Sequence, residues 1–81
     1  MINKIEHIGI AVKDLKKSEE LFQKLLGQSS YKKEEIHSEG VITSFFKIGH
    51  QKIELLKASN PSSPIQKFLE KRNEGVHHIA L

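Results

Sequence analysis

Three side chains, far apart along the chain, are of types that bind divalent cations. His7 and His78 each open a short apolar segment, and Glu54 lies between Ile53 and Leu55. Two imidazoles and one carboxylate suit a hard or borderline divalent cation and leave coordination positions open for a substrate. The same residues also fit a structural role, in which both histidines are hydrogen-bonded and Glu54 faces solvent.

The two histidine segments match in register. "HIGI" begins at His7 and "HIAL" at His78, about 70 residues later, and each reads histidine, isoleucine, small residue, aliphatic residue. We therefore expect an internal repeat whose second copy has only begun, in a fragment or truncated product. A strand without its module leaves backbone edges unpaired, which favours a homodimer with possible strand exchange.

Alternating apolar residues predict four strands, and a period of 3.6 residues predicts two helices. The expected strands are 4–12, 41–48, 51–58 and 76–81, with a tight turn at 49–50, and the expected helices are 14–27 and 63–75. The order β-α-β-β-α-β is that of an α+β domain.

The two predicted helices carry end signals. Asp14 is the expected N-cap of the first helix, and Gly27 suits the left-handed position after its last turn. Ser63 is expected to cap the second helix together with Gln66, and Gly75 to end it. The residues expected to be buried are Leu15, Leu21, Phe22, Leu25 and Leu26 in the first helix and Ile65, Phe68 and Leu69 in the second.

Strand alternation separates the side chains onto two faces. Those expected to pack under a helix are Ile8, Ile10, Val12, His77, Ile79 and Leu81. Those expected on the other face are His7, Gly9, Ala11, Lys52, Glu54, Leu56, Val76, His78 and Ala80. Because several neighbours of the histidines on this second face are small, we expect space above the sheet for a ligand.

The remaining polar residues suggest no further site. His37 and His50 fall in loops or turns, and we assign them, with His77, structural roles. The acidic residues in the connection after the first helix could approach the rim of a site, but we expect them to be solvated; they are Glu34, Glu35 and Glu39. The sequence contains no nucleophile elbow, P-loop or dinucleotide fingerprint.

Composition narrows the functional class. Eighty-one residues with 37% hydrophobic and 28% charged side chains predict one small globular domain. The absence of cysteine leaves only histidines and carboxylates for a metal. One tyrosine and no tryptophan argue against nucleic acid, and the net charge of +3 is compatible with an anionic ligand. Without a long apolar run or leader pattern, we expect a cytoplasmic protein with no membrane contact.

Three segments in this order resemble the methylmalonyl-CoA epimerase family of the vicinal oxygen chelate, or glyoxalase-like, superfamily. They are "HIGIAVKDLKKSEELFQKLLG", "KIELL" and "SSPIQKFLEKRNEGVHHIAL". The resemblance implies an α+β fold of paired βαβββ modules curled around a divalent metal. It implies one truncated glyoxalase-like domain over 1–81, with a first module at 1–58, a linker and helix at 59–75 and the start of a second module at 76–81.

Carried onto this sequence, the resemblance makes His7, Glu54 and His78 the first three ligands of a divalent ion such as Co, Zn, Mn, Ni or Mg. The family's fourth ligand is a glutamate of the second module, beyond residue 81. Thr43 and Ser44 stand where the family places an acidic catalytic residue, so the catalytic residues are left unassigned. We therefore do not expect complete activity from residues 1–81 alone.

The implied activity is inversion of the carbon next to a CoA thioester through a metal-stabilised enolate, which makes the substrate a small-molecule CoA thioester. Two alternatives keep the superfamily and change the reaction: a glyoxalase-type isomerase and an extradiol dioxygenase. A third alternative, from another functional class, is a metal-free module that binds a small ligand in the same cup.

Overall fold

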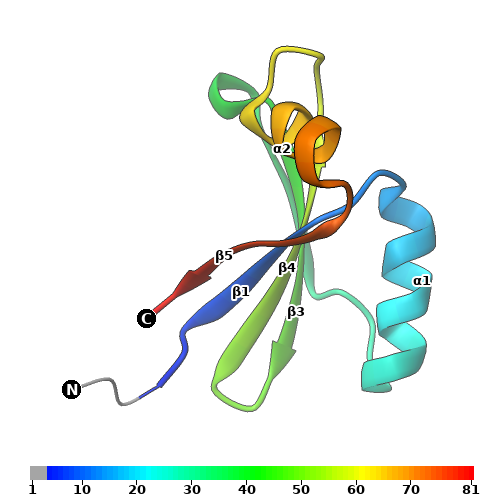
Figure 1. The fold of residues 1–81 in the computed structure, drawn as a ribbon. Helices are drawn as coiled ribbons and strands as arrows, with labels where there is room; N and C mark the ends of the chain where they lie inside the picture. The colour runs from blue at the N-terminus through cyan, green and yellow to red at the C-terminus, as the bar shows by residue number, and fades with distance from the viewer. Residues whose placement is uncertain (1–3) are drawn as a thin grey trace.

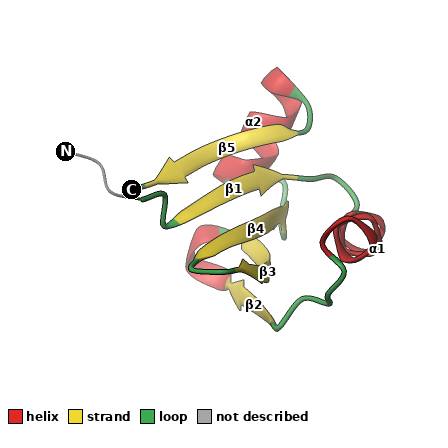
Figure 2. Cartoon of the chain, turned by 90° about the horizontal axis from the view of Figure 1, so that it is seen from below, coloured by secondary structure: helices red, strands yellow, loops and turns green. Residues whose placement is uncertain are grey.

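The structure is a computed structural model that describes residues 4–81, and it contains one mixed five-stranded sheet (Figure 1). The strands are β1 (His7–Ala11), β2 (Lys32–Ile36), β3 (Val41–Ile48), β4 (Gln51–Ala58) and β5 (Gly75–Ala80). Their spatial order is β2-β3-β4-β1-β5 (Figure 2). Strand β1 pairs in parallel with β4 and antiparallel with β5, so segments from the two ends of the fold lie side by side.

The element order confirms the expected α+β class. Strand β1, helix α1 (Leu15–Leu26) and strands β2 to β4 form a βαβββ unit, which helix α2 (Pro64–Arg72) and β5 follow. Among residues 4–81, neither helix has the length and apolar character that crossing a bilayer requires.

Strand β2 was not predicted from the alternation of apolar residues. Its sequence, KKEEI, holds four charged residues in five, and they are exposed because β2 is an edge strand paired only with β3. Glu34 and Glu35 therefore lie on a strand rather than in a loop. A 3-10 turn (His37–Glu39) and Gly40 with φ 64° connect β2 to β3. His37 in that turn and His50 in the β3–β4 turn lie where the sequence predicted irregular structure.

Helix α1 has the predicted ends but a narrower buried face. Asp14 accepts a hydrogen bond from the Lys17 backbone N–H at 3.1 Å, and Gly27 has φ 71°. Leu21 and Leu25, predicted to be buried, are 60% and 71% exposed. A single helix lying on a sheet buries only the stripe that faces the sheet, and these two leucines lie beside that stripe.

Helix α2 begins as predicted and ends earlier. The Ser63 side chain accepts a hydrogen bond from the Ile65 backbone N–H at 3.0 Å, but Gln66 donates to Glu70 instead of closing a capping box. The helix ends at Arg72, and the following residue, Asn73, adopts φ 62°. The sequence predicted that Gly75 ends the helix, and this prediction is wrong, because Gly75 starts β5.

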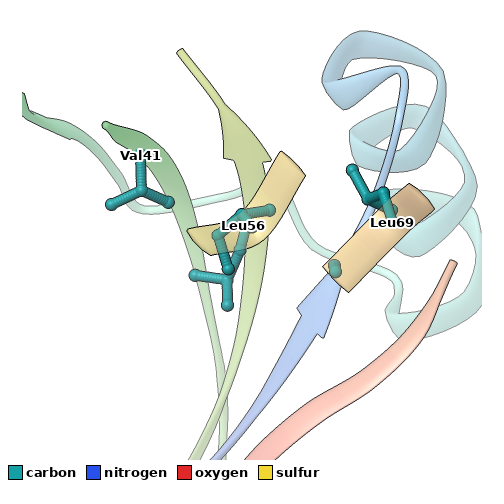
Figure 3. Packing of buried hydrophobic residues seen from close by; sticks show 5 residues of the cluster. Val41, Leu56 and Leu69 are labelled. Atoms are coloured by element: carbon teal, nitrogen blue, oxygen red, sulfur yellow. The ribbon is translucent and has the colours of Figure 1, made fainter. Parts of the chain in front are cut away.

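The core consists of two clusters on opposite faces of the sheet. The cluster under α1 contains Val12, Leu15, Phe46 and Leu55, with partly buried residues such as Ile10, Phe22 and Leu26 packed against it. The cluster under α2 contains Ala11, Val41, Leu56, Ile65 and Leu69 (Figure 3). Consecutive residues of β1 and β4 enter different clusters, because side chains alternate along a strand.

Candidate metal centre

The sheet register brings His7, Glu54 and His78 to one face. Gly9 of β1 pairs with Glu54 of β4 on one side and with His78 of β5 on the other. His7 lies two residues before Gly9, and therefore on the same face. One potential ligand atom from each of the three side chains lies within 4.8 Å of the others. The three residues predicted from the sequence thus form one cluster.

The two imidazoles meet through their Nε2 atoms, which are 2.9 Å apart. Their rings are nearly perpendicular, with an interplanar angle of 89° and centroids separated by 5.0 Å. Two nitrogens bound to one cation at about 2.1 Å and at right angles would be about 3.0 Å apart. The separation of the two Nε2 atoms therefore fits a pair of ligands to one divalent ion. Glu54 Oε2 lies 3.6 Å from His7 Nδ1, the other nitrogen of that ring.

Gly9 is required for this arrangement. A Cβ atom at position 9 would lie 2.2 Å from His78 Cε1 and within 2.7 Å of both ring nitrogens. The His78 ring therefore lies directly over Gly9 and fills the space expected there for a ligand. Gly9 therefore makes room for the His78 imidazole and not for an open ligand site.

Because of a β-bulge, His77 lies on the opposite face of the sheet from the one predicted. His78 pairs with Gly9 and Val76 with Ile10, so β5 has one extra residue, His77, at this point. The bulge moves Val76 to the opposite face from His78 and places His77 on the side of His78. Alternation without a bulge predicts the reverse for both residues.

The His77 ring packs against Phe68 of α2, with centroids 5.0 Å apart and an interplanar angle of 78°. Its Nδ1 atom lies 3.0 Å from His78 Nδ1. Ile79 and Leu81, predicted to pack under a helix with His77, are 53% and 70% exposed because α1 does not cover this edge of the sheet.

Two further side chains adjoin the cluster and were not identified from the sequence. Glu6 Oε1 accepts a hydrogen bond from His7 Nδ1 at 2.7 Å, and Glu6 Oε2 lies 3.3 Å from Lys52 Nζ. The His7 hydrogen bond, followed by that of Lys52, lowers the pKa of Glu6, and Glu6 raises the pKa of Lys52. The signal in the sequence was an acid directly before a candidate ligand histidine.

Burial is the main cause that lowers the pKa of His78, and the positive charges of His7 and His77 act in the same direction. Glu54 acts in the opposite direction with a smaller effect. A lowered pKa keeps the imidazole neutral, which is the form that can bind a cation.

A cavity of about 460 Å³ lies against the cluster. Its polar lining residues are Ser38, Glu39, Thr43, Glu54, His77 and His78, and its apolar walls include Ile36, Leu56 and Ile65. Thr43 therefore faces the cavity, whereas the adjacent Ser44 faces α1, where its hydroxyl donates to Glu19 at 2.6 Å. The exposed residue Glu39, assigned to a solvated connection from the sequence, is the cavity's second carboxylate.

The sequence of this chain is similar to those of several known proteins. The Glyoxalase/Bleomycin resistance protein/Dioxygenase superfamily matches residues 6–81. The chain is 37% identical to the uncharacterized protein YqjC of Bacillus subtilis over 98% of its own length and 56% of that protein. It is 33% identical to the human mitochondrial methylmalonyl-CoA epimerase, covering 99% of this chain and 46% of the human protein.

A solved methylmalonyl-CoA epimerase of Streptomyces coelicolor, in complex with 2-nitronate-propionyl-CoA, has the same fold. The TM-score is 0.89 at 33% identity, over 98% of this chain and 59% of that one. The chain thus spans about half the length of the curated relatives it matches. Because the superfamily match includes all five strands and both helices, the chain belongs to the Glyoxalase/Bleomycin resistance protein/Dioxygenase superfamily.

Proposed function

We propose that this chain forms part of a metal-dependent methylmalonyl-CoA epimerase. The observation that carries the proposal is the convergence of His7, Glu54 and His78 beside a cavity, in a chain whose relatives include epimerases. The proposal covers the substrate, a CoA thioester with a carboxylate on the neighbouring carbon. It also divides the chain into a first module at 1–58, a linker and helix at 59–75 and the start of a second module at 76–81.

The donor set fits a divalent cation of the Co, Zn, Mn, Ni or Mg type. His7 and His78 would supply imidazole nitrogens and Glu54 a carboxylate oxygen, which together leave coordination positions for the substrate. When bound, such a cation stabilises negative charge that develops on the thioester oxygen. The cavity also has apolar walls, including Leu56 and Ile65, beside which such electrostatic stabilisation is stronger than in water.

Epimerisation also needs groups that remove a proton from the substrate carbon and return it on the other side. Thr43 faces the cavity but has no group that titrates near neutral pH. Glu39 is the lining carboxylate outside the proposed ligand set, and we propose it as one proton-transfer group. Replacing Glu39 by glutamine is expected to slow exchange of the substrate proton without weakening cation binding.

Exchange of the substrate's α-proton tests the proposal directly. The protein is incubated with methylmalonyl-CoA and Co²⁺ in D₂O, and loss of the α-proton signal is followed by NMR. Exchange is expected to stop in His7→Ala and His78→Ala and to continue in His37→Ala, since His37 lies outside the cluster. Unchanged exchange in the first two variants would refute the proposal. Absence of exchange from the wild-type protein with every cation tried would refute a proton-transfer group within residues 1–81.

A metal-free ligand-binding module is the second candidate, and one observation favours it. His7 and His78 already contact each other at 2.9 Å, so the pair is hydrogen-bonded without an ion. In that case propionyl-CoA would bind equally well before and after EDTA treatment, and alanine at either position would leave binding intact. Oxygen uptake with a catechol would instead indicate the dioxygenase reaction, and turnover of a thiol hemiacetal the glyoxalase one.

The proposed assembly is a homodimer. Val76, Ile79 and Leu81 expose apolar side chains on or next to β5, which is an edge strand of the sheet formed by residues 4–81. An exposed apolar edge strand favours pairing with another chain, including exchange of β5 between copies. Size-exclusion chromatography over a range of concentrations tests this, and a monomer at all of them would contradict it.

A further inference from the structure

Five side chains form a continuous series of close polar contacts that extends beyond the proposed ligands. His77 Nδ1 lies 3.0 Å from His78 Nδ1, and His78 Nε2 lies 2.9 Å from His7 Nε2. His7 Nδ1 lies 2.7 Å from Glu6 Oε1, and the other oxygen of Glu6 contacts Lys52. Each proposed ligand histidine thus has its Nδ1 atom in contact with a residue outside the ligand set.

When all three histidines are neutral, only one assignment of donors and acceptors satisfies all of these hydrogen bonds. An ionised carboxylate only accepts, so His7 must donate from Nδ1 to Glu6 and accept at Nε2. His78 must then donate from Nε2 to His7 and accept at Nδ1. His77 must finally donate from Nδ1 to His78. The series therefore specifies one tautomer for each ring.

We propose that Glu6 and His77 are positioning residues. Glu6 sets the tautomer of His7 that leaves its Nε2 atom free for a cation, and His77 holds the His78 ring so that its Nε2 atom faces the same cation. The inference rests on the proposed function, because it assigns the outer partners of the same metal centre. Glu6 acts on His7 directly, and Lys52 holds Glu6 in place. Partners of this kind fix the orientation of a ligand histidine and increase its basicity.

His77 has a second task, because His78 Nε2 must lose its proton before it can bind a cation. His77 gives its Nδ1 proton to His78 Nδ1 and takes another from water at its own Nε2. The proton displaced from His78 Nε2 enters the solvent, so the number of protons on the pair is unchanged. The exposure of His77 gives it the contact with water that this shift needs.

The local structure supports this role for His77. The bulge in β5 turns His77 toward His78, whereas a regular strand would turn it to the opposite face. The edge-on contact with Phe68 of α2 then holds the ring. A residue with only a packing role would not need its Nδ1 atom directed at the Nδ1 atom of its neighbour.

The first test reads tautomers in the metal-free chain by ¹⁵N NMR of the imidazole nitrogens. Wild type is expected to show His7 protonated at Nδ1 and His78 at Nε2. Glu6→Ala removes the acceptor of His7 Nδ1, so both tautomers of His7 and of His78 should appear. Glu6→Gln keeps an acceptor at this position and should restore the single tautomers. A single unchanged His7 tautomer in Glu6→Ala would overturn the proposal for Glu6.

The second test measures Zn²⁺ affinity by calorimetry, with folding checked by circular dichroism. Glu6→Ala and His77→Phe are each expected to weaken binding by about 10- to 100-fold. Glu6→Gln, which keeps an acceptor without its charge, should recover part of the loss. The matched controls are Glu35→Ala and His37→Phe, because these residues form another close glutamate–histidine pair, at 3.4 Å.

The two tests separate this inference from the proposed function. If wild type does not bind Zn²⁺, the metal part of the proposed function fails, and the tautomers still decide whether Glu6 sets the rings. If wild type binds Zn²⁺ and both Glu6→Ala and His77→Phe bind it equally well, the positioning role is overturned while the metal centre stands.

Discussion

The two faces of the sheet differ in how their side chains are used. Under α1, apolar side chains from β1, β3 and β4 form a continuous cluster, and it contains the two largest fully buried apolar side chains, Phe46 and Leu55. Under α2, the apolar cluster occupies one end of the face only. Toward the other end, the same strands present His7, Glu54 and His78 beside the cavity.

The difference shows how alternating positions of one strand can supply both the apolar core and the candidate binding site of a small domain. Consecutive residues of β4 illustrate it, since Leu55 enters the α1 core and Glu54 enters the candidate metal centre. A chain of this length has a limited core, so apolar side chains on one face must compensate for polar ones on the other. Substitutions on the α1 face should therefore change stability, and those at the polar end of the α2 face should change binding.

The largest stability effect is expected from Phe46→Ala. Phe46 is fully buried and lies 6.1 Å from the Phe22 ring of α1, so its removal leaves a cavity that costs about 3–5 kcal/mol. That is a large share of the stability of a small domain. Urea unfolding measures the loss. Phe45→Ala is the matched control, since Phe45 is partly exposed on the other face, and an equal loss there would contradict the comparison.

Gly9→Ala should damage the α2 face with a smaller stability cost. The new Cβ would collide with the His78 ring and push it away from His7, so Zn²⁺ affinity should fall at least about tenfold. The overpacking costs about 1–3 kcal/mol. Gly75→Ala is the control, because a Cβ there meets no atom within 4 Å. Unchanged Zn²⁺ affinity in Gly9→Ala would show that the imidazole contact is not needed.

Ser44→Ala tests a part-buried polar contact that joins α1 to the sheet. The fully buried Ser44 hydroxyl donates to Glu19 at 2.6 Å, and Glu19 also contacts Lys33 at 3.2 Å. Because Lys33 remains as a partner for Glu19, we expect a loss of about 1 kcal/mol. Thermal unfolding measures it, with Ser30→Ala as an exposed control. A loss as large as that of Phe46→Ala would mean that this polar contact, not apolar burial, dominates the α1 face.

Local alternation was sufficient to place the three residues of the candidate metal centre on one face of the sheet. Strand periodicity puts His7 and Gly9 on one face, and the repeated histidine segment identified His78 as the equivalent of His7. Glu54 could be assigned to the same face because its neighbours Ile53 and Leu55 are apolar. These inferences need only residues that are close in sequence and a regular strand.

Features that depend on pairing between strands were not predictable. The bulge at His77 arises from the register between β1 and β5, and no local pattern indicates it. Strand β2 is held by its pairing with β3, although four of its five residues are charged. The contact between Glu6 and His7 depends on the orientation of two side chains, so it also lies beyond a periodicity argument.

The smallest effect is expected from Leu25→Gln, at a position that periodicity predicted to be buried. Leu25 is 71% exposed, and the neighbouring Leu21 is 60% exposed, so a polar residue should change stability by no more than about 0.5 kcal/mol. Phe22→Gln, one position beyond Leu21 and packed against the α1 cluster, should cost several times more. Equal losses in urea unfolding would mean that α1 buries a wider stripe than the structure shows. Leu25 would then have to be counted with the residues that α1 packs against the sheet.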